Sequence, residues 1–290
     1  MVLMASSVFA AVGLTALYTN QNKLIYPSWV QKSNKFVEKP NELQFSELLP
    51  YFKETFISTE DGIQLQVYTF NKPNFSEKKT LLIFRPNAGN IGHSLPRINY
   101  MFHKYDFNIV IWSYRGYGLS SGSPEESGIK SDCSELYLFL MNQGYISDTT
   151  SKNFNEPKLI LLGTSIGGAV SIYFASEYPE NIGALVLENT FLSLAKTIPY
   201  VLPWFKYLVP MCHEKWASES LIGNLNTKMS LLILSSMKDE VVPPSHSTRL
   251  YELSNSDEKL IRKFKNGYHN DIMFQKGYWE IIDEFMHNVI

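Results

Sequence analysis

The sequence is poor in cysteine, since its 290 residues include only Cys133 and Cys212. Structural zinc sites built on thiolates need two or more cysteines at ligand spacing, so this class of site is excluded. The simplest interpretation is two buried or free thiols. A disulfide between them stays an alternative, because the sequence does not give the distance between their Cα atoms.

The sequence also lacks an excess of charge of either sign. Its 26 Lys and Arg residues nearly balance 28 Asp and Glu residues, and no basic cluster is present. Nucleic-acid-binding domains usually carry a basic patch or stripe, so nucleic acid is excluded as a predicted partner. A hydrophobic share of 44% is typical of a globular enzyme with a sizeable core.

Charge is absent from the first 18 residues, MVLMASSVFAAVGLTALY. As a helix, residues 2–18 would span about 26 Å, just under the roughly 30 Å of bilayer hydrocarbon. Tyr26 and Trp29 follow, near where a membrane interface would lie. We expect residues 1–20 to be a single-pass membrane anchor through about residues 2–18, in a membrane that the sequence does not specify. Residues 21–50 would form a linker.

Two alternatives to the anchor stay open. A cleaved signal peptide would also be apolar and has suitable small residues here, but it usually has a basic start, which this chain lacks. The other alternative is a soluble helix packed on the domain. The sequon Asn74-Phe75-Ser76 is relevant only if the domain is lumenal.

Short, continuously apolar runs recur from residue 80 onward, separated by segments with helical spacing. Such runs are typical of strands buried on both faces of a parallel sheet. Their repeated alternation with helices predicts an α/β domain over residues 51–290, with a mostly parallel central sheet and helices on both faces. The runs cover residues 80–84, 107–112, 158–162, 184–187 and 230–234.

One stretch, residues 191–225, breaks this alternation by combining prolines with aromatic residues. It is either a set of helices packed on the sheet edge or a small cap over the active site that supplies an apolar pocket. If it is a cap, we expect Trp204, Phe205 and Tyr207 to bind substrate.

The segment Gly163-Thr164-Ser165-Ile166-Gly167 has the pattern G-x-S-x-G. It follows an apolar run and precedes a helical one, which is the context of a nucleophile elbow. The tight turn needs small residues on both sides of the serine, and the two glycines meet that need. Ser165 is therefore the predicted nucleophile, and the backbone N–H of Ile166 is a predicted oxyanion donor.

A serine nucleophile needs a base, which in this arrangement follows the acid along the chain. His269 lies in a loop after the run 259–264 and is the predicted base. The other late histidines fit less well. His213 lies in the cap-like stretch, His246 is too close to the acid, and His287 is late in the terminal helix.

Asp239 is the predicted acid, because it follows the run 230–234, which we expect to neighbour the nucleophile's strand. A buried carboxylate there fixes the histidine tautomer and stabilises the imidazolium. Glu240 is the main rival and Glu188, just past another strand, is a weaker one. A second oxyanion donor is expected from the loop after residues 80–84, either the backbone N–H of Asn87 or, alternatively, that of Ala88.

These features together resemble the α/β-hydrolase superfamily. The similar branch consists of membrane-anchored eukaryotic proteins that include α/β-hydrolase domain-containing protein 13 and the fungal bud-emergence (Bem) family. The resemblance extends nearly from end to end. Beyond the predicted triad, it is carried by Leu24-Ile25-Tyr26-Pro27, Asn87-Ala88-Gly89-Asn90, Tyr114-Arg115-Gly116-Tyr117-Gly118, Glu188-Asn189-Thr190-Phe191 and Lys238-Asp239-Glu240-Val241-Val242-Pro243-Pro244.

The chain departs from that family at Arg85-Pro86, where His-Gly is usual. Proline fixes φ and has no N–H, so the shape of the oxyanion hole is left open. The resemblance implies a serine hydrolase of ester or thioester type that needs no cofactor or metal. The apolar cap and the anchor favour a lipid-like or acylated substrate near a membrane. A membrane-tethered scaffold without catalysis is the alternative, and a peptidase of this fold is a third interpretation.

Overall fold

The computed structural model describes residues 2–30, 36–147 and 158–289; within the first helix, side chains are described for residue 13 and from residue 15 onward. In these ranges the chain forms one eight-stranded sheet with the order β1-β2-β4-β3-β5-β6-β7-β8. The strands β3 to β8 are parallel, and the antiparallel hairpin of β1 and β2 extends the sheet beside β4. The strands are β1 (Phe52–Ser58), β2 (Gln64–Phe70), β3 (Thr80–Phe84), β4 (Asn108–Trp112), β5 (Leu159–Thr164), β6 (Ile182–Glu188), β7 (Ser230–Ser236) and β8 (Lys259–Phe264).

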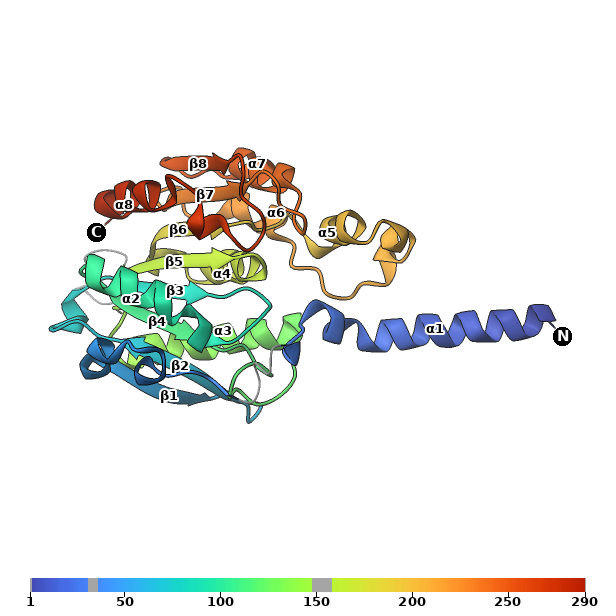
Figure 1. Ribbon diagram of the computed structural model, residues 1–290, viewed down its shortest axis with the longest axis horizontal. Helices are drawn as coiled ribbons and strands as arrows, with labels where there is room; N and C mark the ends of the chain where they lie inside the picture. Colours follow the sequence, from blue (N-terminus) through green and yellow to red (C-terminus); the bar gives the residue numbers. More distant parts are fainter. Residues whose placement is uncertain (1, 31–35, 148–157, 290) are drawn as a thin grey trace.

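Helices cover both faces of this sheet, as predicted (Figure 1). The side chains of α2 and α8 pack on one face, and those of α3, α4 and α7 pack on the other. The central strands β3 and β4 are buried along their whole length, which explains why their sequences are continuously apolar. The helices are α1 (Val2–Ile25), α2 (Leu95–Lys104), α3 (Glu126–Asn142), α4 (Ile166–Glu177), α5 (Leu194–Val201), α6 (Ser218–Leu221), α7 (Pro244–Leu253) and α8 (Tyr278–Val289).

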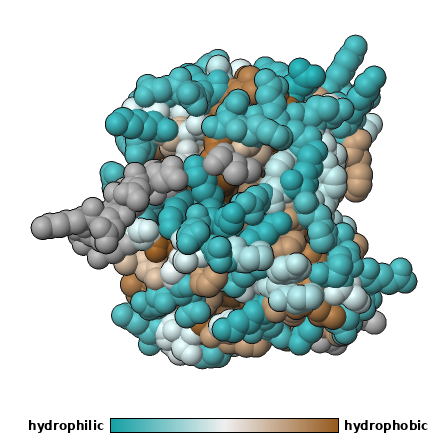
Figure 2. Space-filling model, turned by 90° about the vertical axis from the view of Figure 1, so that its left-hand side faces the viewer, coloured by the Kyte–Doolittle hydropathy of each residue, from teal (hydrophilic) through white to brown (hydrophobic). Residues whose placement is uncertain are grey.

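Residues 191–225 form α5, α6 and short 3-10 turns that include η7 (Pro203–Tyr207), η8 (Val209–Met211) and η9 (Ile222–Asn224). Figure 1 shows α5 and the turns that follow it leaving the body on the side from which α1 projects. The opposite side of the molecule, seen in Figure 2, carries mostly hydrophilic side chains, with hydrophobic ones in small separate patches.

The predicted anchor, residues 2–18, falls within α1, and most of its side chains lie outside the described residues. Across the described part of the chain, no helix has the length and hydrophobicity required to cross a membrane. One expectation needs correction. Tyr26 does not face a membrane interface, because its side chain is buried and hydrogen-bonded to Glu214 and Trp216. Trp29, in contrast, is exposed.

Part of the predicted linker, residues 21–50, contributes to the globular body. Val37 and Leu48 are buried in the core on the α2 side of the sheet. Two 3-10 turns, η2 (Pro40–Leu43) and η3 (Ser46–Tyr51), lead directly into β1. The stretch therefore packs as part of the domain before the sheet begins.

Candidate active site

Ser165 lies at the sharp turn between β5 and α4, with φ 54° and ψ −121°. Residues other than glycine rarely adopt a positive φ, and such backbone strain costs about 1–3 kcal/mol unless the surroundings hold it. Here the Ser165 N–H donates to the Glu188 carbonyl at 2.8 Å, and the Thr190 hydroxyl donates to the Ser165 carbonyl at 2.7 Å. The turn is thus fastened from the neighbouring strand β6.

The glycines around the serine leave no room for side chains. A Cβ at Gly163 would lie 2.4 Å from the Ser171 hydroxyl oxygen, and one at Gly167 would lie 2.1 Å from the Phe84 carbonyl oxygen. The N-terminus of α4 can therefore pack directly against the end of β3. This close approach explains the demand for small residues in the G-x-S-x-G pattern.

The structure brings the three predicted triad residues together. His269 Nε2 lies 3.0 Å from Ser165 Oγ, and His269 Nδ1 lies 2.8 Å from Asp239 Oδ2. All three side chains are buried. The second oxygen, Asp239 Oδ1, accepts backbone N–H bonds from Val241 at 2.8 Å and Val242 at 2.7 Å. These bonds hold the carboxylate in place, so it can orient the imidazole as the acid of a triad does.

The two rival carboxylates lie in other positions. Glu240 accepts the backbone N–H of His269 at 3.1 Å, and no hydrogen bond joins it to the imidazole ring. Glu188 forms a buried ion pair with Arg97 and accepts a hydrogen bond from Tyr278. Burial alone would raise the pKa of the Glu188 carboxyl, but the Arg97 charge and the hydrogen bonds donated to it hold that pKa below its usual value.

Asn189 connects the ends of two strands with the loop that carries the base. Its side-chain amide donates to the His269 carbonyl at 2.9 Å, and its side-chain oxygen accepts the Ser236 N–H at 2.8 Å. Its φ of 45° lies in the left-handed region that asparagine tolerates better than most residues. Sequence reasoning did not assign Asn189 a role. The available signals were its place directly after a buried strand and its position in the segment Glu188-Asn189-Thr190-Phe191, which carries the family resemblance.

Arg85 and Pro86 precede the predicted oxyanion donor Asn87. The Arg85 side chain is buried, and its Nη1 donates to the Ala88 carbonyl at 3.1 Å, which closes the loop on itself. Its guanidinium lies 4.9 Å from the centre of the Tyr117 ring, a cation–π distance. Burial lowers the pKa of Arg85. Arg85 therefore acts as a brace inside the loop that replaces the usual His-Gly.

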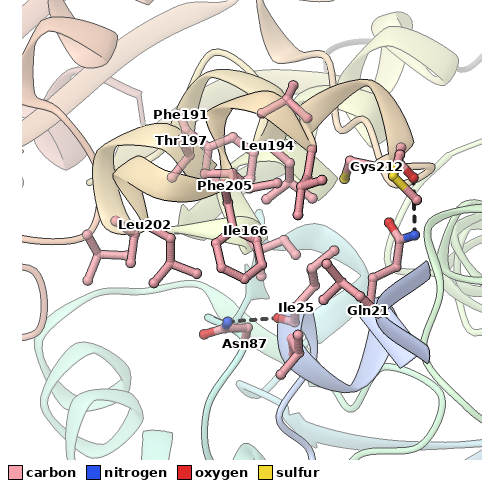
Figure 3. A pocket seen from close by; sticks show the side chains of 18 of the residues that line it. Gln21, Ile25, Asn87, Ile166, Phe191, Leu194, Thr197, Leu202, Phe205 and Cys212 are labelled. Carbon is pink, nitrogen blue, oxygen red and sulfur yellow. Dashed lines mark hydrogen bonds between the residues drawn. The ribbon is translucent and has the colours of Figure 1, made fainter. Parts of the chain in front are cut away.

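An apolar cavity of about 270 Å³ opens beside the triad. Ser165 lines it together with both predicted oxyanion residues, Ile166 and Asn87. Figure 3 shows Ile166 between side chains of the segment 191–212 and those of α1, with Asn87 beside Ile25 on the α1 side. Among the described residues that line this cavity, none is charged. The reacting atoms therefore face apolar surroundings.

Of the three aromatic residues predicted to bind substrate, the structure places only Phe205 in the cavity wall. Trp204 and Tyr207 are 88% and 75% exposed and lie outside the wall. The reason is the 3-10 geometry of η7, in which residues three apart share a face. Trp204 and Tyr207 share the outer face. Phe205 shares the inner face with Leu202 and Leu208, both of which line the cavity.

Cys133 and Cys212 are both free and buried. Cys212 lines the cavity, and Cys133 does not. Within the described ranges, no group of three or more His, Cys, Asp or Glu side chains is arranged to hold a metal ion.

Comparison with known proteins shows the family. Residues 93–230 match the family described as serine aminopeptidase, S33. An uncharacterized membrane protein of Saccharomyces cerevisiae is 40% identical, over 95% of this chain and 92% of that protein. Protein bem46 of Schizosaccharomyces pombe is 36% identical, over 98% of this chain and 91% of its own. The chain belongs to the α/β-hydrolase family, in the branch of these relatives.

Solved structures of low sequence identity have the same fold. An esterase of Pyrococcus furiosus has a TM-score of 0.65 at 15% identity and covers 88% of this chain and 94% of its own. An α/β hydrolase of Vibrio vulnificus has a TM-score of 0.69 at 15% identity and covers 91% of each chain. The predicted α/β-hydrolase fold is thereby confirmed.

Proposed function

We propose that this protein is a serine hydrolase that cleaves carboxylic ester or thioester bonds of lipid-like or acylated substrates near a membrane. The observation that carries this proposal is the unbroken chain of contacts from Asp239 through His269 to Ser165, at 2.8 and 3.0 Å. This series of contacts ends at Ser165, beside an apolar cavity large enough for a substrate group.

The geometry suits acyl transfer in two halves. His269 Nε2 accepts the proton of Ser165 Oγ as the oxygen attacks the substrate carbonyl, and then gives that proton to the departing alcohol or thiol. A water molecule next attacks the acyl-enzyme and gives a proton to His269. The bond between the acyl carbon and Ser165 Oγ then breaks, the carboxylic acid leaves, and His269 returns the proton to Ser165 Oγ. Asp239 stabilises the imidazolium in both halves. The backbone N–H groups of Ile166 and Asn87 are the proposed donors to the oxyanion.

The cavity favours an acyl ester or thioester over a peptide with a free amino terminus. An α-ammonium group bound in an apolar site needs a carboxylate partner, because burying an unpaired charge is very unfavourable. The described residues that line this cavity include no Asp or Glu that could pair with such a group. This lining supports an ester or thioester substrate.

The proposed location is a membrane, reached through the first part of α1. The yeast relative that is 40% identical is named a membrane protein. The first charged residue of this chain is Lys23. An uncharged helical stretch of this kind can enter hydrocarbon without burying a charge.

Labelling of the full chain with a fluorophosphonate tests the proposal. We expect wild type to be labelled, and Ser165→Ala and His269→Ala to lose the label. The matched controls are Ser176→Ala, on α4, and His287→Ala, exposed on α8, which should label like wild type. A folded wild-type protein without any labelling would favour the alternative, a membrane-tethered scaffold that does not catalyse.

A further inference from the structure

The last two turns of α1 form one wall of the cavity that contains Ser165. The lining residues on this helix are Leu17, Tyr18, Gln21, Leu24 and Ile25. Their spacing places them on one face, because residues three, four, seven and eight apart lie above one another on an α-helix. The N-terminal helix is therefore part of the site and not only a tether that leads to it.

The opposite wall comes from α5 and the turns after it. Leu194, Ile198 and Val201 follow helical spacing along α5, and Phe205 follows in η7. Figure 3 shows this wall facing α1 across the cavity, with Ile25 and Gln21 on the α1 side and Leu194 and Phe205 on the other. Segments about 180 residues apart in the sequence thus enclose a common space.

Two sets of polar contacts near the C-terminal end of α1 hold it in this position. Buried Gln21 donates to the Met211 carbonyl at 3.3 Å and accepts the His213 N–H at 3.0 Å. Four residues later, the Ile25 carbonyl accepts a hydrogen bond from the Asn87 side chain at 3.0 Å. Asn87 also belongs to the proposed oxyanion loop, so α1 is connected directly to the catalytic centre.

The dimensions and the rim of the cavity indicate what it holds. About 270 Å³ lies just below the roughly 300–1,000 Å³ usual for small-molecule sites, so the cavity suits a small apolar group such as one acyl chain. The exposed rim is apolar, since Leu24 is 65% exposed and Leu202 47% exposed while both line the cavity.

We propose that α1 is a wall of the acyl-binding site, and that the substrate is an ester or thioester of a single unbranched acyl chain. This inference rests on the proposed serine hydrolase function. In this arrangement the acyl chain of the substrate lies between α1 and α5, in apolar contact with both, and its carbonyl group reaches Ser165. The limited volume of about 270 Å³ favours one acyl chain over a bulkier group.

The test compares tryptophan substitutions on two sides of α1 in the full chain. Leu17→Trp places an indole in the cavity, whereas Ala16→Trp places the same group on an exposed position that does not line it. The measurement is kcat/KM for p-nitrophenyl decanoate relative to p-nitrophenyl acetate. We expect this ratio to fall at least about tenfold in Leu17→Trp and to stay at the wild-type value in Ala16→Trp.

A second variant lies on the opposite wall and changes the cavity in the opposite direction. Phe205→Ala enlarges the cavity and should raise the rate for p-nitrophenyl palmitate relative to the decanoate. Fluorophosphonate labelling of each variant shows that its active site is assembled. An unchanged ratio in a labelled Leu17→Trp protein, or an equal fall in both tryptophan variants, would overturn the role of α1 alone. A wild-type protein that neither labels nor hydrolyses any of the esters would overturn the proposed function instead.

Discussion

At the level of single residues, Asn189 holds the loop that carries His269. Its amide is bonded to the backbone at Ser236, which ends β7, and to the carbonyl of His269. The base His269 lies in a loop, so its distance to Ser165 Oγ depends on the hydrogen bonds that hold this loop, including the bond from Asn189. Asn189 does not touch the reacting atoms, so it acts as a positioning residue.

We expect Asn189→Gly to lower kcat by roughly ten- to a hundredfold, because a catalytic group misplaced by about 1 Å can cost a factor of that size. Glycine accepts the positive φ, so the change removes the amide without adding backbone strain. The measurement is kcat and the rate of fluorophosphonate labelling. The control is Asn74→Gly, since Asn74 has φ 56° and is exposed away from the site. Equal activity of both variants would contradict the assigned role.

The three candidate triad positions could be chosen from the sequence because each follows a predicted strand. Parallel strands end at the same edge of the sheet, which brings residues 165, 239 and 269 together. The expectation that the run 230–234 lies next to the nucleophile's strand was wrong, because β6 lies between β5 and β7. The roles of Asn189 and Arg85 could not be predicted in this way. Asn189 bonds to the backbone of a distant segment and Arg85 bonds within its own loop, and neither bond leaves a pattern in the sequence.

At the level of elements, the buried ion pair of Arg97 and Glu188 and its hydrogen-bond partner Tyr278 connect α2, β6 and α8. Arg97 on α2 pairs with Glu188 at the end of β6, and Tyr278 at the start of α8 donates to the same carboxylate. The Thr164 hydroxyl adds a hydrogen bond of 2.7 Å from the end of β5. The cluster therefore braces the strand ends on both sides of the nucleophile.

We expect Arg97→Met to lower the free energy of unfolding by about 3–5 kcal/mol at pH 7.5, because Glu188 is left as an unpaired buried charge. In wild type the pKa of Glu188 is lowered, so its contribution is complete above the unfolded pKa and is lost as the pH falls through the folded value. In the variant, burial would raise that pKa and favour the protonated form. The difference between the two proteins should therefore shrink at pH 5.

Urea unfolding at both pH values measures this difference. The matched control is Arg249→Met, which removes an ion pair with Glu252 whose side chains are both more than half exposed. Exposed pairs contribute little, so the control should unfold like wild type at either pH. A loss of stability in Arg97→Met that is the same at pH 7.5 and pH 5 would contradict the argument from Glu188.

Hydrophobic patterns in the sequence predicted the strands, but they did not predict which side chains of the segment 203–207 face the cavity. The apolar runs at 80–84 and 230–234 fall within β3 and β7. In the segment 203–207, however, aromatic content alone did not show which side chains face inward. In a 3-10 turn, residues three apart share a face, so Trp204 and Tyr207 lie together and Phe205 lies on another face. The sequence alone did not show that this segment is a 3-10 turn.

At the scale of the whole molecule, α1 and the segment 191–212 give the protein one distinctive side. We expect the full chain to sediment with phospholipid vesicles and to resist extraction by high salt, because the proposed contact is apolar and salt screens only charges. A shortened chain that starts at Lys23 should stay in the supernatant, with its fold checked by circular dichroism. Release of the full chain by salt alone would contradict an anchor in the hydrocarbon.

The sequence could not show that α1 contributes to the site. The uncharged stretch favoured an anchor followed by a linker, since nothing local distinguishes a tether from a wall. The contacts of Gln21 with Met211 and His213 join positions about 190 residues apart, and only the folded chain brings them together. Tyr26 illustrates the same limit, because its burial depends on Glu214.

Gln21 has a mechanical consequence for the whole protein. By bonding to the backbone on both sides of Cys212, it connects α1 to the segment 191–212 on the opposite side of the cavity. A helix anchored in a bilayer tilts to match the thickness of the hydrocarbon around it. In the arrangement that we propose, thinning or thickening of the membrane would shift one wall of the cavity, and turnover would respond to the physical state of the bilayer.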